Sequence, residues 1–264
     1  MTSPPARILY QSFTDPAVHQ PYLSRLQAYL TEIAAPGVTY EVRGISPADT
    51  QLGRLSELRC GVQSVAGIVQ AAEEGFDAVL VGHFQDACLY EARTAVDIPV
   101  IGHGEASMLQ ACMLGGRIGL MTLDPVYLSW HNEQIARYGL SSRVVDVRPL
   151  LLTPDQAVAA YDDAAAYQSI KDTFVSLATA MVRESGVDVV MSAGGLFALL
   201  SARDHVEVPG ALVANPTLLA VRQAEASVAI ARANGTPVSR GGTFAKATPQ
   251  AIQELLTLVK GTQE

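Results

Sequence analysis

Cysteine and charged residues are both scarce in this chain of 264 residues. The three cysteines, Cys60, Cys88 and Cys112, show no Cys-x-x-Cys spacing, which argues against a disulfide framework and a structural zinc site. Charged residues make up 17% of the chain and hydrophobic residues 49%, so there is ample material for a core and no sign of disorder. The length fits one large domain or two small ones.

Positive charge is also in short supply, and long apolar runs are missing. The net charge is −8, and a surface of that sign repels phosphate groups, so we expect neither a nucleic-acid partner nor docking on an anionic membrane. No apolar run approaches the ~18–20 residues that span a bilayer, and no secretory signal pattern is present. We therefore expect a cytoplasmic protein whose partner is a small molecule, and a homo-oligomer remains open.

Short apolar runs alternate with longer segments that have apolar residues at helical spacing. The main strand candidates are residues 8–10, 38–42, 78–81, 98–101, 118–121, 187–191 and 211–213. The main helix candidates are residues 22–33, 62–72, 216–233 and 248–259. Continuous apolar strands separated by helices predict a parallel sheet covered on both faces, which is the α/β class.

Two segments of the chain, residues 75–82 and 186–193, are similar to each other. Each places a Gly-x-Asp sequence before an apolar strand and follows an amphipathic helix. Any helix–glycine–strand unit has this pattern, but the similarity also fits a duplicated lobe. Duplication would place matching strand ends on two sides of a cleft, and open parallel sheets bind ligands at the carboxyl ends of their strands.

His83 follows the strand candidate 78–81, where the chain leaves the sheet. Gly82 before it would let a substrate approach the backbone closely, and Phe84 follows it. A histidine in this place titrates near neutral pH and can act as an acid or a base. The alternative is a structural histidine bonded to a loop carbonyl, and we favour the chemical role.

His103 leaves the next strand candidate, 98–101, between two glycines, and either lines a site or has a structural role. Glu105 fits the start of a helix, where the dipole favours a carboxylate. Zinc or iron could be ligated by a set of two histidines and two carboxylates: His83, His103, Asp86 and Glu105. Their spacing matches no recognised metal motif, so we expect neither a metal nor an organic cofactor.

Hydroxyl groups and backbone amides near other strand ends have the chemistry to bind carboxylate oxygens. Their alternative role is helix capping or turn formation. The candidate residues of this kind are Ser12, Thr14, Thr122, Ser192, Ala193, Gly194 and Gly195.

Three segments resemble those of a known enzyme family. Residues 76–86, Phe-Asp-Ala-Val-Leu-Val-Gly-His-Phe-Gln-Asp, resemble the first active-site segment of hydantoin racemases, which ends a strand with Ala-Cys-Phe-x-Asp. Residues 98–106 resemble their Pro-Val-Ile-Gly-x-x-Glu-Ala segment, and residues 187–196 resemble the second active-site segment, Leu-Gly-Cys-Ala-Gly-Met. The resemblance covers nearly the whole chain and identifies it as a member of the Asp/Glu/hydantoin racemase superfamily.

The resemblance implies two similar Rossmann-like lobes, each with a parallel sheet, related by a pseudo-twofold axis with the active site in the cleft between them. Residues 1–104 plus about 216–264 would form the first lobe, and residues 105–215 the second. In the family, a cysteine from each lobe flanks the substrate, one to remove the α-proton and one to deliver a proton. His83 and Ala193 occupy the cysteine positions here. Alanine cannot transfer protons, so this alignment excludes a two-thiol racemisation.

The superfamily also includes maleate isomerases and arylmalonate decarboxylases, which handle negative charge beside a carboxylate without an organic cofactor. We therefore expect a cofactor-independent enzyme that acts on a small carbonyl or carboxylate compound by one-sided proton transfer through His83, with an enolate stabilised by preorganised donors. Its reaction would be isomerisation or racemisation, or that of a C–C or C–N lyase such as a decarboxylase. The alternatives are a metal-assisted lyase or hydrolase that uses His83 and His103, and a non-catalytic small-molecule binding protein.

Overall fold

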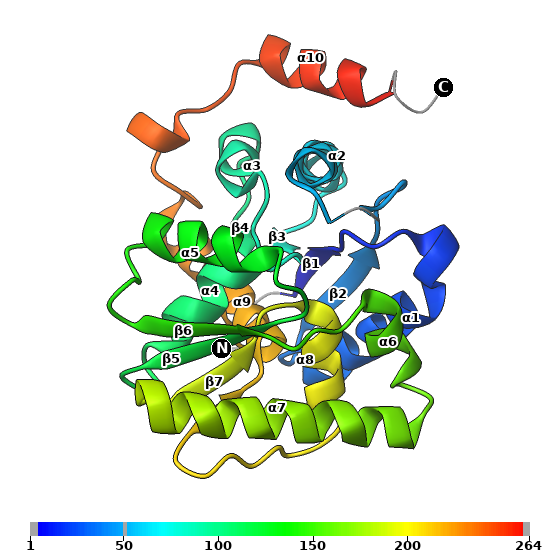
Figure 1. Cartoon of the computed structure of the whole chain (residues 1–264). Coiled ribbons are helices and arrows are strands. Elements are labelled where there is room, and N and C mark those ends of the chain that lie inside the picture. The colour runs from blue at the N-terminus through cyan, green and yellow to red at the C-terminus, as the bar shows by residue number, and fades with distance from the viewer. Residues whose placement is uncertain (1–4, 50–51, 261–264) are drawn as a thin grey trace. The chain divides into compact units, whose positions relative to one another are not determined.

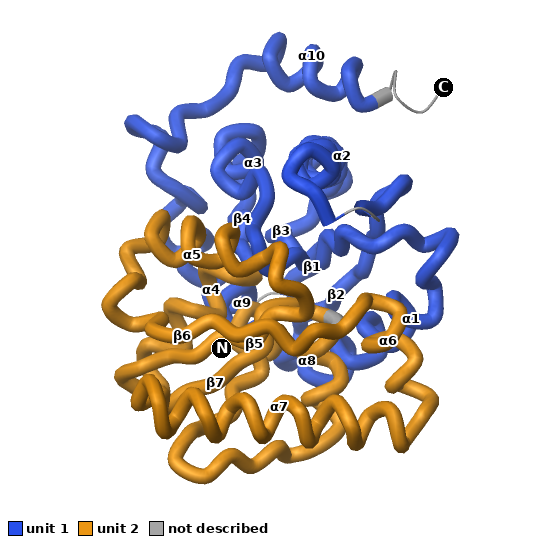
Figure 2. The backbone as a smooth tube through the Cα atoms, in the orientation of Figure 1, with its two compact units in different colours: residues 1–102, 221–264 blue, residues 103–220 orange. Residues whose placement is uncertain are grey.

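The computed structural model describes residues 5–49 and 52–260. The chain divides into two compact units, one of residues 1–102 and 221–264 and the other of residues 103–220 (Figure 2). Each unit contains a four-stranded parallel sheet with helices on its faces. Within the described residues, no helix is both long and apolar enough to cross a membrane.

The first unit is built on a parallel sheet with the strand order β2-β1-β3-β4. The strands are β1 (Ala6–Gln11), β2 (Val38–Arg43), β3 (Ala78–Val81) and β4 (Val100–Gly102). The helices are α1 (Pro16–Ile33), α2 (Arg54–Glu73), α3 (Leu89–Ala95), η1 (Gly242–Phe244, a 3-10 helix) and α10 (Pro249–Lys260). Helices α2 and α3 cover one face of the sheet, and α10 lies on their outer side (Figure 1). Gln11 and Val81, the last residues of β1 and β3, pair with each other. The two strands therefore end at the same edge of the sheet, and the residues that follow them are neighbours.

The second unit repeats this plan with the strand order β6-β5-β7-β8, again all parallel. The strands are β5 (Ile118–Thr122), β6 (Val144–Pro149), β7 (Val189–Ser192) and β8 (Leu212–Ala214). The helices are α4 (His103–Ala111), α5 (Tyr127–Arg137), α6 (Pro154–Ala159), α7 (Ala164–Ser185) and α8 (Gly195–Ser201). Helix α9 (Pro216–Asn234) begins in this unit and ends in the first.

The two sheets have the same topology, because in each the first strand of the unit lies between the second and the third, and the fourth lies outside the third. The central strands β3, β5 and β7 are buried along their whole length, as expected for strands covered on both faces. The predicted α/β class with two Rossmann-like parallel sheets is therefore confirmed. The pseudo-twofold axis and the cleft between the lobes remain predictions.

Candidate functional site

The candidate site of the first unit lies at the carboxyl ends of β1 and β3. Gly82 directly follows β3, and its amide donates to the carbonyl oxygen of Gln11 at 2.8 Å. A Cβ atom at Gly82 would lie 2.0 Å from a ring carbon of Tyr10, which is fully buried in β1. The packing of Tyr10 is therefore sufficient reason for glycine at this position, whether or not a substrate approaches it.

His83 forms an ion pair with Glu57, which lies in the first turn of α2. The imidazole Nε2 is 2.8 Å from one carboxylate oxygen and 3.0 Å from the other. Both side chains are largely enclosed, with 21% of His83 and 14% of Glu57 exposed. Glu57 was not among the site residues expected from the sequence, because no motif surrounds it and it lies 26 residues from His83.

Phe13 covers one side of the His83 imidazole. The two rings are stacked with their centroids 4.4 Å apart and their planes 2° from parallel. Phe13 lies in the loop after β1, and His83 in the loop after β3, so the pairing of these two strands brings the rings together. Stacking and the bond to Glu57 together restrict the orientation of the imidazole, and an aromatic face also favours a cation.

Carboxylates surround His83 and set the direction of its pKa. Burial alone lowers the pKa of His83, but the negative charges of Glu57, Asp86 and Asp49 outweigh it, and the pKa is raised above its ordinary value. Asp86 is fully buried in the turn that follows His83. Gly102 makes room for it, since a Cβ atom there would lie 2.7 Å from the Asp86 carboxyl carbon.

The other candidate residues of the first unit have defined surroundings. Ser12 is buried, and its hydroxyl accepts a bond from the amide of Thr14 at 3.2 Å. This bond closes a local turn, so the hydroxyl has a structural partner already. Phe84 is 1% exposed and its ring lies in the interior.

In the second unit, Thr122 ends β5 and is fully buried beside a histidine. Its hydroxyl oxygen is 3.2 Å from Nε2 of His131, whose Nδ1 is 3.3 Å from the side-chain oxygen of Gln134. An amide oxygen accepts, so Nδ1 of His131 donates to Gln134 and Nε2 then accepts from the Thr122 hydroxyl. His131 belongs to none of the sequence motifs, and only the folded structure shows its contact with Thr122.

The segment 192–195 begins with Ser192 at the end of β7, and its hydroxyl and backbone amides were candidates for binding carboxylate oxygens. The amide of Ala193 donates to the carbonyl oxygen of Met121 at 2.6 Å, so it belongs to the sheet ladder and does not point at a ligand. Gly194 has φ 152° and precedes α8, which begins at Gly195. The hydroxyl of Ser192 is buried with no hydrogen-bond partner among the described residues.

His103 begins α4 and is fully buried. Its Nε2 lies 3.4 Å from the hydroxyl of Thr217, which is also fully buried, and its carbonyl accepts from Ser107 at 2.6 Å. These contacts favour a structural role for His103. Within residues 5–49 and 52–260, no three histidine, cysteine, aspartate or glutamate side chains are grouped so that they could hold a metal ion.

Two of the three cysteine side chains are poorly suited to thiolate chemistry. Cys60 is buried, and burial raises the pKa of its thiol. Burial is also the main cause that raises the pKa of Cys88 to about 11, with Glu91 and Glu57 adding to it. Because the thiolate is the reactive form, neither thiol is activated at neutral pH.

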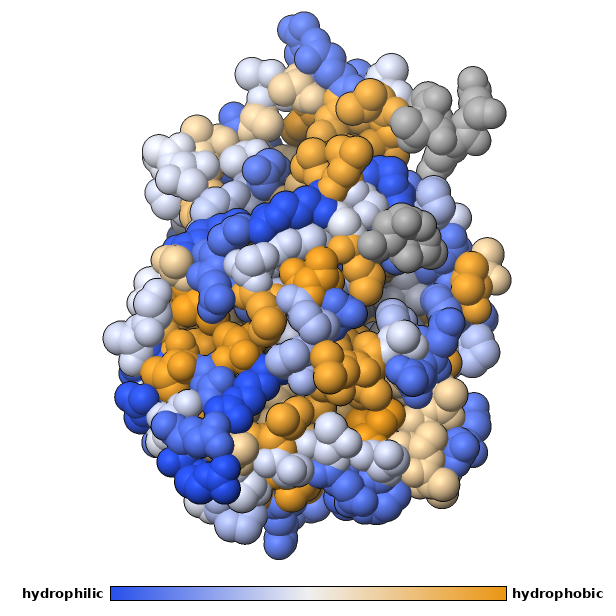
Figure 3. Space-filling model, viewed as in Figure 1, coloured by the Kyte–Doolittle hydropathy of each residue, from blue (hydrophilic) through white to orange (hydrophobic). Residues whose placement is uncertain are grey.

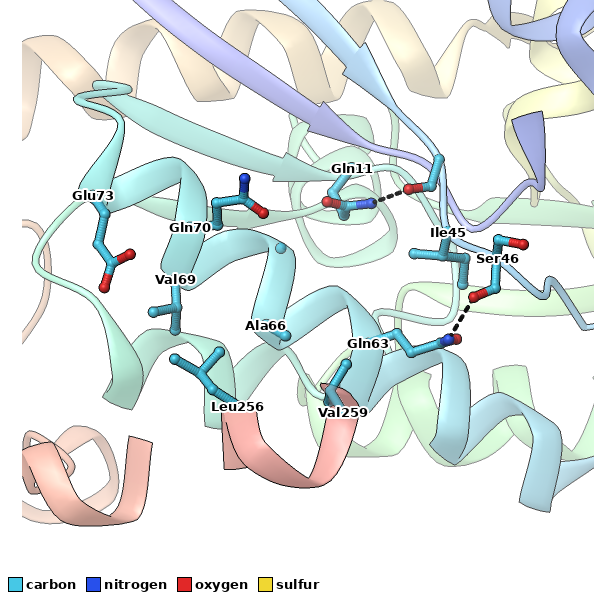
Figure 4. A pocket seen from close by; sticks show the side chains of 12 residues that line it. Gln11, Ile45, Ser46, Gln63, Ala66, Val69, Gln70, Glu73, Leu256 and Val259 are labelled. Atoms are coloured by element: carbon cyan, nitrogen blue, oxygen red, sulfur yellow. Dashed lines mark hydrogen bonds between the residues drawn. The ribbon is translucent and has the colours of Figure 1, made fainter. Parts of the chain in front are cut away.

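A separate cavity of about 520 Å³ lies in the first unit beside the end of β1 (Figure 4). Glutamine side chains dominate its polar lining, and two of them are engaged with the backbone: Gln11 donates to the Ser12 carbonyl at 3.2 Å and Gln63 to the Ser46 carbonyl at 2.9 Å. Leu256 and Val259 of α10 close one side (Figure 4). Among its lining residues Glu73 carries the one titratable side chain, and no histidine, lysine or arginine lines it.

Apolar side chains also gather on the surface over α10 and the neighbouring α2 (Figure 3). The exposed large apolar residues of these two helices are Leu55, Leu58 and Leu258. They line a second, apolar hollow of about 690 Å³.

Comparisons with known proteins agree with this architecture. Among curated proteins, a hydantoin racemase from Pseudomonas sp. (strain NS671) is 32% identical over 89 residues, which cover 32% of this chain and 36% of that protein. Among solved structures, allantoin racemase from Klebsiella pneumoniae superposes with a TM-score of 0.75 at 22% identity, covering 95% of this chain and 98% of the other. A variant of arylmalonate decarboxylase, in its sulfate-associated form, has a TM-score of 0.50 at 16% identity over 85% of this chain and 94% of the other.

The likeness to these two solved structures concerns the fold, because both are less than 25% identical to this chain. The hydantoin racemase match spans about a third of that relative's length. The family model for Asp/Glu/Hydantoin racemase matches residues 17–224, well over half of the chain. The chain therefore belongs to the Asp/Glu/hydantoin racemase family.

Proposed function

We propose that this protein is a cofactor-independent isomerase or lyase that acts on a small carbonyl or carboxylate compound by proton transfer through His83. The observation that carries the proposal is the setting of His83. Its imidazole follows the carboxyl end of β3, is paired with Glu57 and is stacked on Phe13. An imidazole held in one orientation beside a carboxylate is suited to general acid–base catalysis.

From the resemblance of the two active-site segments, we assign His83 and Ala193 to the positions where hydantoin racemases have their two cysteines. His83 can move a proton and Ala193 cannot, so the proposed reaction transfers a proton on one face of the substrate. Hydroxyl and amide groups would stabilise the enolate that forms, and such preorganised donors are usually the largest contribution to catalysis. Ser192, Gly194 and Gly195 are the proposed donors in the second unit. Thr122 is a proposed contact, because its hydroxyl proton is already donated to His131.

The class of substrate is proposed from the named activities of the relatives. Two of them are named as racemases of hydantoin and allantoin, and a third as a decarboxylase of arylmalonates. For this chain we therefore propose a small compound in which a carbonyl or carboxylate stands beside the reacting carbon. A carbanion at that carbon is delocalised onto oxygen, where hydrogen-bond donors can stabilise it.

The test is a screen in heavy water with a small panel of hydantoins, amino acids and substituted malonates, followed by proton NMR. We expect turnover of at least one compound class, with deuterium entering one face of the product. In the His83→Asn variant the rate should fall by at least ~10²-fold, the lower range for a lost general acid or base. Near-normal turnover by a folded His83→Asn protein would refute the proposal.

A further inference from the structure

Glu57 reaches the His83 imidazole from a part of the chain that none of the sequence motifs includes. Both of its carboxylate oxygens lie within hydrogen-bond distance of Nε2, at 2.8 and 3.0 Å. A carboxylate oxygen accepts and does not donate, so the proton of this bond resides on Nε2. Nε2 is therefore protonated both in the neutral and in the charged imidazole.

The second ring nitrogen, Nδ1, makes no hydrogen bond to any residue of the described ranges 5–49 and 52–260. Since Nε2 keeps its proton for Glu57, Nδ1 is the atom at which His83 gains and loses a proton. The stacked ring of Phe13 covers a face of the imidazole and leaves its edge, where Nδ1 lies, uncovered by that contact.

The charges that act on His83 come from several elements, and all of them are negative. Glu57 belongs to α2, Asp86 to the turn after β3, and Asp49 to the segment that precedes α2. Phe13, from the loop after β1, is neutral and presents a π face that favours a cation. This arrangement stabilises the imidazolium form of His83, and Glu57 is the nearest contributor.

We infer that Glu57 is a positioning residue that orients the His83 imidazole and keeps it protonated, so that His83 acts as a proton donor through Nδ1. The inference rests on the proposed function, in which His83 moves the proton. It adds two points to that function: the proton moves from His83 to the substrate, and it leaves from Nδ1. The direction follows because an imidazolium can give a proton to a carbanion but cannot take one from carbon.

A donor site has a consequence for the substrate. The carbanion that His83 protonates must arise by a step other than removal of a proton by His83. Loss of a carboxyl group as CO₂ meets this need, since the electron pair of the broken C–C bond stays on the α-carbon as an enolate. The Nδ1–H bond then breaks as the new C–H bond forms, the imidazole becomes neutral, and water returns the proton. Donation thus favours C–C lyase chemistry over isomerisation.

The first test needs no substrate. Protein with ¹⁵N-labelled histidine is titrated by NMR, and the His83 signals are assigned by their absence in His83→Asn. We expect the neutral form of wild-type His83 to carry its proton on Nε2. We expect Glu57→Gln to lower the pKa of His83 by roughly 1 to 3 pH units, the usual effect of losing an adjacent opposite charge.

Two further variants separate the effects of Glu57. Glu73→Gln removes the same charge from an exposed position of the same helix and should leave the His83 signals unchanged. Glu57→Ala should also allow the neutral imidazole of His83 to carry its proton on either nitrogen. Glu57→Gln should not, because glutamine retains an oxygen that accepts from Nε2 and alanine does not. An unchanged pKa and an unchanged tautomer in folded Glu57→Gln and Glu57→Ala would overturn the inference.

The second test is the pH dependence of turnover with the compound found in the screen. The wild-type rate should fall as the pH rises through the pKa of His83, and Glu57→Gln should move this fall to lower pH. If the role of Glu57 were merely structural, Glu57→Gln would lower the rate equally at every pH. A rate that rises with pH through the pKa of His83 would refute donation. Activity that survives in His83→Asn would refute the proposed function instead, and the NMR result would still decide the role of Glu57.

Discussion

Asp77 and Asp188 make the same contact in two different sheets. Asp77 precedes β3 and accepts the amide proton of Arg7 in β1 at 2.8 Å, while Asp188 precedes β7 and accepts that of Arg117, next to β5, at 2.8 Å. In return, each aspartate amide donates to the carbonyl of the same arginine, at 2.8 and 2.9 Å. The repeated Gly-x-Asp sequence therefore has a physical role, which is to join the beginnings of two central strands. This shared contact supports duplication of the unit.

The first prediction concerns this contact. Asp188→Ala removes the acceptor for the amides of Gly116 and Arg117, and should lower the free energy of unfolding by about 1–2 kcal/mol, because the amides can still reach water. Backbone hydrogen bonds lower the pKa of Asp188, so its stabilising effect is present above the unfolded pKa and is lost as the pH falls through the folded pKa. Urea unfolding of Asp188→Ala and wild type at several pH values is the measurement. A difference that grows at acid pH would contradict this account.

The second prediction tests why glycine follows β3. Gly82→Ala would force a methyl group into the Tyr10 ring, which is fixed in the core, and should cost about 1–3 kcal/mol of unfolding free energy. Gly53→Ala is the matched control, since its added Cβ would meet no atom closer than 3.5 Å. Thermal unfolding of both variants measures the difference. Equal stability of the two variants would show that Tyr10 can move aside.

The third prediction concerns the effect of pH on stability through His83. Its pKa is raised in the folded protein, so pairing with Glu57 stabilises the fold fully below the unfolded pKa of ~6.5, and this contribution is lost as the pH rises through the folded pKa. Glu57→Gln should therefore be less stable than wild type at pH 6 and closer to it at pH 9. Melting curves across this range are the check, and the opposite trend would contradict the pairing.

The fourth prediction is indifference to loss of the thiols. Replacement of Cys60, Cys88 and Cys112 by alanine should leave turnover largely intact in protein that remains folded. The proposed site assigns none of them a catalytic role, and burial raises the pKa of Cys88 to about 11. Activity of the triple variant and its far-UV circular dichroism are the measurements. Loss of activity in Cys88→Ala alone would point to Cys88 as a nucleophile.

The fifth prediction concerns the relation between the lobes. We expect His83 and Ala193 to lie on opposite sides of one cleft, within reach of a shared small ligand, as the family resemblance implies. A crystal structure with a small carboxylate bound would measure both distances. If either residue lies beyond side-chain reach of the ligand, the alignment of the two cysteine positions is wrong.

The sequence by itself determined the class of fold and the main strands. Residues 78–81 and 118–121, and residues 189–191 within the candidate 187–191, carry no polar side chain, and the structure has the fully buried strands β3, β5 and β7 there. This pattern is readable because a strand covered on both faces needs apolar side chains at every position. Strand β6 was not among the candidates, since it lies at the edge of its sheet and most of its side chains are half-buried. The sequence also placed His83 two residues after the end of a strand, and with it the candidate site.

Only the tertiary structure decided what surrounds His83. Glu57 lies 26 residues before it on a helix, and Phe13 follows a different strand, so no local pattern links the three side chains. The contact of Thr122 with His131, and the reason for glycine at position 82, likewise depend on partners that a sheet or helix brings close. The physical reason is the same in each case. Periodicity reports whether a residue is buried, whereas hydrogen bonding, stacking and the resulting pKa depend on which distant side chains share its space.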